Sequence, residues 1–77
     1  MKIKEAINMI IWKYKDRKED FQLVIRDRFV NEVEIPFKDI QRVDNNYIYL
    51  YNETIIPLHR VLRIKKGNIT IWRRYST

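Results

Sequence analysis

Apolar residues near the start of the chain recur at intervals of three and four. Ile3, Ala6, Ile7, Ile10 and Ile11 fall on one stripe, and the positions between them are mostly polar. This spacing is typical of one face of an amphipathic helix. It predicts a helix over residues 2–13, and the charged stretch KYKDRKED that follows either extends this helix or forms a loop.

From Phe21 onward the period of the pattern changes from about 3.6 to two. Phe21, Leu23 and Ile25 alternate with Gln22, Val24 and Arg26, which predicts a half-buried strand. The following segment, FVNEVE, is expected to be a turn or irregular. In the next segment, IPFKDI, the proline suits a strand end or the first turn of a short helix.

Turn-forming residues separate three further predicted strands in the second half of the chain. The strands are expected over residues 47–51, 54–58 and 69–74. The turns are expected at residues 44–46, 52–53 and 66–68, the last of which holds the single glycine. We expect Asn52 to supply the positive φ of the middle turn.

These elements predict the fold class α+β. An N-terminal helix would pack on a curled antiparallel sheet of four to six short strands, in a strongly curled or barrel-like arrangement. The length of 77 residues favours one domain over residues 1–77, and we find no internal repeat.

The net charge of +6 is distributed unevenly along the chain. Residues 1–53 hold ten Lys and Arg residues and ten Asp and Glu residues, so they are neutral. The remaining 24 residues hold six Lys and Arg residues and no carboxylate. A basic region of this kind indicates a polyanionic ligand, although it is also compatible with a solvated surface.

The residue inventory excludes several classes of protein. There is no cysteine and one histidine, which excludes a thiolate zinc site and a two-histidine nuclease and disfavours any other zinc site, so we expect no cofactor and no metal. One glycine cannot build a phosphate-binding loop. No apolar run is long enough to cross a membrane, and no signal peptide is evident. We expect a cytoplasmic protein without membrane contact and without enzymatic activity.

A tyrosine stripe is the first candidate binding feature. Tyr47, Tyr49 and Tyr51 alternate with Ile48 and Leu50, so on a strand the three rings face one way and the aliphatic side chains the other. Tyr47 and Tyr49 could then stack on unpaired bases. Alternatively, the stripe reflects the strand propensity of tyrosine and packs against another element.

The last predicted strand carries the second candidate. Thr70, Trp72 and Arg74 share one face, so Trp72 could stack on a base beside arginine. The alternative is that the N-terminal helix or Trp12 covers Trp72, because tryptophan is usually largely buried.

The third candidate is the stretch IPLHRVLRI, which places His59, Arg60 and Arg63 in an apolar segment. In an unbroken strand Arg60 would face the core, where an unpaired guanidinium is not tolerated. Either a carboxylate pairs with Arg60, or a bulge or tight turn breaks the strand. In the second case Arg60 can bind a phosphate and His59 can donate a further hydrogen bond.

The same region resembles the RNA cyclic group end recognition domain family, which consists of small, mostly archaeal proteins. The family pattern has an Ile-Pro-Tyr-His-Arg-Ile segment, a glycine turn and a Trp-x-Arg ending. The matching positions are Ile56, Pro57, His59, Arg60, Ile64, Gly67, Trp72 and Arg74. The chain departs from the pattern at Leu58, which replaces the tyrosine, at Asp27, which replaces a glycine after Arg26, and at Asn52-Glu53, where the family has a glycine.

The resemblance implies recognition of RNA ends, in particular a terminal 2′,3′-cyclic phosphate. The phosphate-binding residues would be His59, Arg60, Arg63, Arg26, Arg73 and Arg74, and Trp72, Tyr47 and Tyr49 would stack on bases. The expected partners are single-stranded or processed RNA and, in addition, RNA-processing proteins; the sequence does not determine the oligomeric state. Two alternatives stay open, a protein-interaction or structural subunit of an RNA-processing assembly and a weak nuclease that uses His59.

Overall fold

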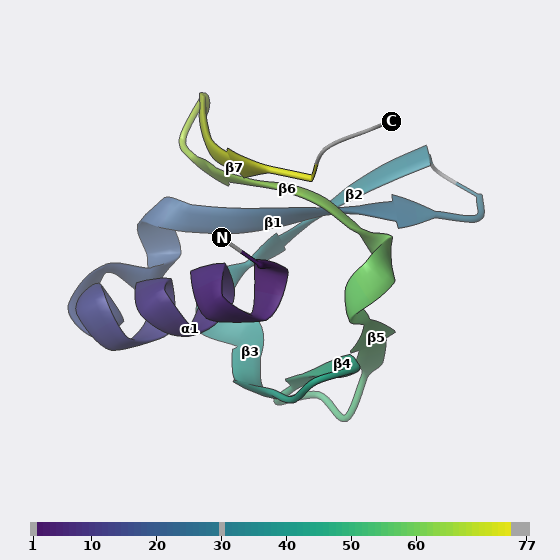
Figure 1. The fold of residues 1–77 in the computed structure, drawn as a ribbon, viewed down its shortest axis with the longest axis horizontal. Coiled ribbons are helices and arrows are strands. Elements are labelled where there is room, and N and C mark those ends of the chain that lie inside the picture. Colours follow the sequence, from purple (N-terminus) through teal and green to yellow (C-terminus); the bar gives the residue numbers. More distant parts are fainter. Residues whose placement is uncertain (1, 30, 75–77) are drawn as a thin grey trace.

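The computed structural model describes residues 2–29 and 31–74 (Figure 1). In these described residues, one α-helix, α1 (Ile3–Lys13), precedes seven strands. The strands are β1 (Phe21–Asp27), β2 (Asn31–Pro36), β3 (Ile40–Val43), β4 (Tyr47–Leu50), β5 (Ile55–Pro57), β6 (Val61–Lys66) and β7 (Ile69–Arg73). Three short 3-10 helices connect them, η1 (Lys15–Asp20), η2 (Phe37–Asp39) and η3 (Leu58–Arg60).

Helix α1 confirms the helix predicted from the apolar stripe. Ala6, Ile7 and Ile10 are buried, and Ile3 and Ile11 pack beside them against the core. The charged linker that follows does not extend the α-helix but forms η1, which is kinked at Arg17. Among the described residues, no helix is both long and apolar enough to cross a membrane.

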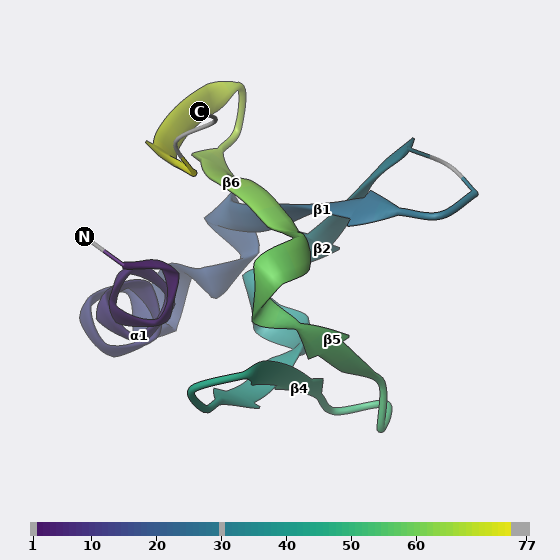
Figure 2. The same cartoon turned by 45° about the vertical axis from the view of Figure 1, so that its right-hand side comes forward.

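The strands form two antiparallel sheets, which confirms the fold class α+β. The first has the order β2-β1-β6-β7 and the second the order β3-β4-β5. The single curled sheet of four to six strands that we expected is thus divided into two sheets with seven strands. Figure 2 shows the β1–β2 and β4–β5 hairpins extending from the centre of the molecule in different directions.

Two local expectations were wrong. The segment FVNEVE contains the start of strand β2, because Val33 and Ile35 point inward and alternate with the exposed Glu32 and Glu34. In the β4–β5 turn, the residue with positive φ is Glu53 at 71° and not Asn52. Asn52 instead accepts a 3.0 Å hydrogen bond from the Thr54 N–H through its side-chain oxygen.

The backbone crosses between the two sheets at two places, and both crossings have the same design. The segments Ile35–Ile40 and Ile56–Val61 share the pattern Ile-Pro-apolar-x-x-apolar, a similarity that we did not recognise as a repeat in the sequence. Pro36 and Pro57 have nearly equal backbone angles, φ −63° and ψ 140° against φ −62° and ψ 135°. Proline fixes φ and lacks an N–H group, so it ends the strand and leads into the 3-10 turn.

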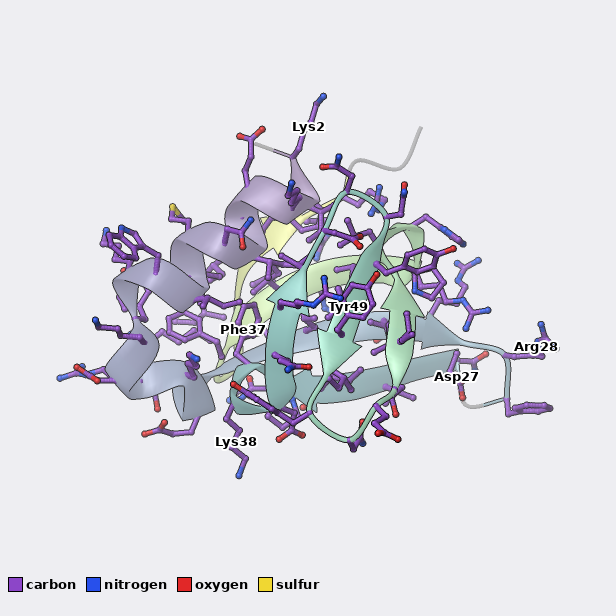
Figure 3. All side chains as sticks on the ribbon, turned by 90° about the horizontal axis from the view of Figure 1, so that it is seen from below. Lys2, Asp27, Arg28, Phe37, Lys38 and Tyr49 are labelled. Carbon is purple, nitrogen blue, oxygen red and sulfur yellow. The ribbon has the colours of Figure 1, made fainter. Side chains whose placement is uncertain are left out.

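Each crossing buries the apolar residue that follows the proline. Phe37 is fully buried and Leu58 nearly so. Phe37 also contacts Phe21 edge-on, and Phe21 contacts Tyr14, so aromatic rings connect η2, β1 and the end of α1. In Figure 3, Phe37 lies within the body of the molecule, whereas Lys38 projects from its edge. Both crossings therefore anchor the two sheets to one core.

The central strand β1 is buried on both faces. Leu23 and Ile25 belong to the core, whereas Val24 faces the opposite side and is still only 1% exposed. The register places Val24 between Glu34 of β2 and Arg63 of β6. Since charged side chains cover apolar neighbours with their methylene groups, we infer that these long side chains shield Val24.

Replacement of Phe37 by alanine tests how much the crossing contributes to stability. The truncation leaves a cavity in the core and should lower the free energy of unfolding by about 3–5 kcal/mol. This is a large part of the roughly 5–15 kcal/mol that holds a typical domain together. The adjacent change Lys38→Ala, at an exposed position, should stay within about 0.5 kcal/mol. Urea unfolding followed by circular dichroism measures both, and similar losses would show that the crossing is not an anchor.

Candidate functional site

His59 and Arg60 lie on the 3-10 turn η3, which separates β5 from β6. The turn decides between the two alternatives for Arg60, because the strand is broken and the side chain does not enter the core. Both side chains are exposed. Within the described part of the chain, neither side chain has a hydrogen-bond or ion-pair partner.

The first crossing along the chain, at η2, provides an internal reference for these two residues. Its exposed positions are Lys38 and Asp39, which carry opposite charges. The equivalent positions in η3 carry His59 and Arg60, with no acid beside them. The crossing itself needs only the isoleucine, the proline and the buried apolar residues. The pair of basic side chains is therefore not a requirement of the fold.

Arg74 holds the η3 turn in place from the end of β7. Its guanidinium donates a 2.9 Å hydrogen bond to the Leu58 carbonyl and a 3.0 Å hydrogen bond to the Val61 carbonyl. The backbone N–H of Arg74 also donates to the Leu62 carbonyl at 3.1 Å. Arg74, predicted to bind phosphate, thus contacts the carbonyls on both sides of His59 and Arg60 and positions these residues.

Tyr47 lies directly beside this turn. It pairs in register with Pro57, and the Leu58 N–H donates to the Asn46 carbonyl at 2.9 Å. Tyr47 is 42% exposed, whereas Ile48 and Leu50 are buried, as the alternation predicts. The structure therefore brings one of the predicted stacking residues next to His59 and Arg60.

Tyr49 is engaged in a hydrogen-bond network on the outer face of the sheet β3-β4-β5 (Figure 3). Its hydroxyl donates to Asp44 Oδ2 at 2.6 Å, and the Arg42 guanidinium lies over its ring at 3.8 Å. As predicted for the turn at residues 44–46, Asp44 Oδ1 also accepts hydrogen bonds from the backbone N–H groups of Asn46 and Tyr47. One face of the Tyr49 ring is thus covered by arginine.

This network shifts two pKa values in opposite directions. The hydrogen bond from Tyr49, followed by those from the Asn46 and Tyr47 N–H groups, lowers the pKa of Asp44. The hydrogen bond to Asp44 raises the pKa of the Tyr49 hydroxyl, whereas the positive charge of Arg42 lowers it. A charged carboxylate favours the protonated phenol, so the Tyr49 hydroxyl remains a hydrogen-bond donor.

Two basic residues of the four-stranded sheet form ion pairs with acids. Arg63 pairs with Glu32 at 2.9 Å, and this hydrogen bond lowers the Glu32 pKa. Lys65 pairs in the same way with Glu34. The two acids lie on β2, which is separated from β6 only by β1. The charge surplus of the last 24 residues is therefore partly neutralised by residues from the neutral first part of the chain.

The other predicted site residues lie farther from the turn or are partly buried. Arg73 is exposed on β7 opposite Arg63, and Arg26 is exposed on β1 opposite Glu32. Trp72 pairs in register with Ile64, is half-buried and packs against the core, with the Arg74 guanidinium 5.9 Å from its ring centre. The residues gathered at η3 are thus His59, Arg60, Arg74 and Tyr47.

A hollow that the sequence did not indicate lies beside Leu58. Its volume is about 490 Å³, and it lies between the start of α1 and the β3–β4 turn. Residues lining it are Lys2, Ile3, Lys4, Glu5, Asn8, Asn45 and Leu58. Lys2 projects from the start of α1 in Figure 3. More than 35 positions separate the helix residues from Asn45 in the chain, so no local pattern could have linked them.

Comparison with known proteins reveals close relatives along nearly the whole chain. The family model described as MJ1316 RNA cyclic group end recognition domain matches residues 1–74. The UPF0248 protein SSO2687 of Saccharolobus solfataricus is 54% identical over 79 residues, covering 96% of this chain and 98% of that protein. A UPF0248 protein of Metallosphaera sedula is 49% identical over 74 residues, covering 96% and 94% of the two chains. No solved structure matches the chain.

Removal of the Asp44 charge should change the titration of Tyr49. In Asp44→Asn, the Tyr49 pKa should fall toward its ordinary value of 10.0, because the carboxylate no longer favours the protonated hydroxyl. Arg42→Gln should raise the Tyr49 pKa above its value in the unaltered protein, because the positive charge that lowers it is removed. Carbon-13 NMR of the tyrosine rings measures both, and shifts of the same sign in the two variants would contradict the network. The Tyr49 pKa is higher in the folded protein than in the unfolded chain. The hydrogen bond from Tyr49 to Asp44 therefore stabilises the fold below pH 10, and this stabilisation is lost as the pH rises through the folded-state pKa of Tyr49.

Loss of the Arg74 side chain should loosen the η3 turn. Arg74→Ala removes two hydrogen bonds to backbone carbonyls and should lower the free energy of unfolding by about 1 kcal/mol, since the site is partly solvated. Hydrogen exchange at the Val61 amide, which closes the turn, should become faster. Arg73→Ala is the matched control and should leave this exchange rate unchanged. Equal effects of both changes would mean that Arg74 does not hold the turn.

Proposed function

Because the chain belongs to the MJ1316 RNA cyclic group end recognition domain family, we propose that it is a small RNA-binding module. It would recognise processed RNA ends that carry a 2′,3′-cyclic phosphate or a related group. The observation that carries the proposal is the η3 turn, which presents His59 and Arg60 to solvent without an acidic partner among the described residues. The domain name of the family supports an RNA partner.

The chemistry of the two side chains suits a terminal phosphate. Arginine offers a planar set of N–H donors that matches two phosphate oxygens, and the imidazole N–H adds a third donor. The carbonyls of η3 are held by Arg74, so the turn is positioned before the ligand arrives. Such preorganisation lowers the entropy cost of binding.

The surroundings of the turn suit an RNA strand. Tyr47 offers an exposed ring on which an unpaired base can stack, a contact worth about 1–3 kcal/mol. Arg26 and Arg73 add long-range attraction for the backbone, whereas the ion pair with Glu32 reduces the contribution of Arg63. Arg74 would contribute to RNA binding indirectly, by holding the turn that positions His59 and Arg60. Trp72 and Tyr49 have less accessible ring surface and would contribute less to stacking.

Binding without catalysis is part of the proposal. Cleavage or opening of a cyclic phosphate by acid–base chemistry needs a positioned acid and a positioned base, and η3 offers a single imidazole beside an arginine. The cytoplasmic location inferred from the sequence stays a prediction.

A second role in a protein assembly draws support from Trp12 and Phe29, which are 81% and 87% exposed. RNA-processing proteins would be the partners at these side chains.

The two crossings allow a matched test of Arg60. Short RNA oligonucleotides ending in a cyclic phosphate, a 3′-phosphate or a hydroxyl are titrated against the protein and its variants by fluorescence anisotropy. Arg60→Ala should weaken binding of the cyclic end by about 10- to 100-fold, as expected for loss of charge-assisted hydrogen bonds. Lys38→Ala, at the equivalent turn, should change affinity less than threefold. His59→Ala should weaken binding by a smaller factor than Arg60→Ala.

Two controls separate end recognition from general attraction. A 3′-phosphate carries more negative charge than a cyclic phosphate, so pure electrostatics would favour the 3′-phosphate. Salt titration should show a slope that falls by about 0.7 in Arg60→Ala, as expected for one lost phosphate contact on a single strand. Equal, weak affinity of the unaltered protein for all three ends would overturn the proposed function.

A further inference from the structure

The hollow beside Leu58 has the mixed chemistry that a nucleotide requires. Lys2 and Lys4 supply positive charge, Asn8 and Asn45 supply amide donors and acceptors, and Leu58 supplies apolar surface. Its volume of about 490 Å³ is within the range of about 300–1,000 Å³ typical of small-molecule sites. Phosphate, base edge and ribose face could each find a suitable contact there.

The hydrogen-bond partner of Lys4 is a neutral side chain, so the positive charge of the lysine is not neutralised by it. The Lys4 ammonium donates a 2.8 Å hydrogen bond to Asn45 Oδ1, a neutral amide oxygen. This bond fixes the lysine at the edge of the hollow and also joins α1 to the β3–β4 turn. An acid at the same position would neutralise the ammonium. Glu5 is the one acid among the residues lining the hollow, against two lysines, so the site retains a positive charge.

The hollow adjoins η3, and this position suggests which part of an RNA end it would bind. Leu58 lines the hollow and is the first residue of η3, immediately before His59 and Arg60. The Leu58 N–H is bonded to the Asn46 carbonyl, so the turn that carries Asn45 is attached to η3 as well. A terminal phosphate at His59 and Arg60 would thus be held by the two residues that directly follow a residue lining the hollow.

We propose that this hollow binds the terminal nucleoside of the RNA end, with Lys2 and Lys4 meeting the phosphate on its 5′ side. The inference rests on the proposed function, because it assumes that the terminal phosphate is held at η3. The base enters between Asn8 and Asn45, and the preceding base remains available to Tyr47. The protein then reads a whole terminal nucleotide and not a phosphate alone.

A single charge change tests the hollow without removing a lysine. Asn45→Asp places a carboxylate next to Lys4 and cancels its charge, so binding of the cyclic-phosphate oligonucleotide should weaken at least tenfold. Asn52→Asp makes the same chemical change in the β4–β5 turn and should change affinity less than threefold. Lys4→Ala should weaken binding of the same oligonucleotide to the same extent as Asn45→Asp. The proposal can therefore still be tested if one of the two variants does not fold. Circular dichroism checks folding in each case.

A direct readout uses a 2′,3′-cyclic mononucleotide as the probe. Two-dimensional NMR of the nitrogen-15-labelled protein should show shifts at the amides of Asn8, Asn45 and Leu58 in addition to those of His59 and Arg60. If Arg60→Ala abolishes binding while Asn45→Asp and Lys4→Ala retain it, the hollow does not hold the nucleoside, although end recognition stands. If the unaltered protein does not distinguish the cyclic end, the proposed function fails and the assignment of the hollow fails with it.

Discussion

The architecture depends on burying one apolar residue at each point where the backbone leaves one sheet for the other. Two small sheets and an 11-residue helix cannot form separate cores, so they must share one. A crossing strand loses its ladder partners, and its backbone groups must be satisfied locally. The proline and the short 3-10 turn solve both problems, since proline has no N–H to satisfy and the next side chain, Phe37 or Leu58, enters the core.

This solution also creates the candidate site. The two residues after the buried side chain face solvent, and the core places no demand on their chemistry. In η2 they are Lys38 and Asp39, and in η3 they are His59 and Arg60. The same backbone geometry thus serves only the fold at one crossing and supports a proposed phosphate contact at the other. Arg74 adds rigidity to the second crossing by bonding its carbonyls.

Sheet order redistributes charge in a way that a linear count does not show. The six basic residues after position 53 have no acidic neighbour in sequence. The order β2-β1-β6 nevertheless brings Glu32 and Glu34 within reach of Arg63 and Lys65. These exposed ion pairs contribute little to stability, but they leave less positive charge on this sheet. Among the described residues, positive charge without an ion-pair partner remains at η3, on Arg73 and at the start of α1.

The sequence alone determined the features that depend on local periodicity and on residue type. The apolar stripe with a period of about 3.6 residues predicted α1, and the alternation with a period of two predicted β1 and the tyrosine stripe. The turn-forming residues at positions 44–46 predicted the turn that Asp44 caps. For the segment from Ile56 to Ile64 the sequence left two alternatives, a carboxylate partner for Arg60 or a broken strand, and the structure shows the break. Its pattern also resembled the family to which the chain belongs. Helix, strand and turn preferences act over a few residues, so these inferences did not need the fold.

Only the tertiary structure decided which distant residues meet. It divided the strands between two sheets, paired Arg63 with Glu32, directed the Arg74 guanidinium to the η3 carbonyls, and placed Asn45 beside Lys4. Each of these contacts joins residues at least 13 positions apart. Such contacts follow from sheet order and from the position of the helix. Both depend on the packing of the whole core, and no local pattern encodes them.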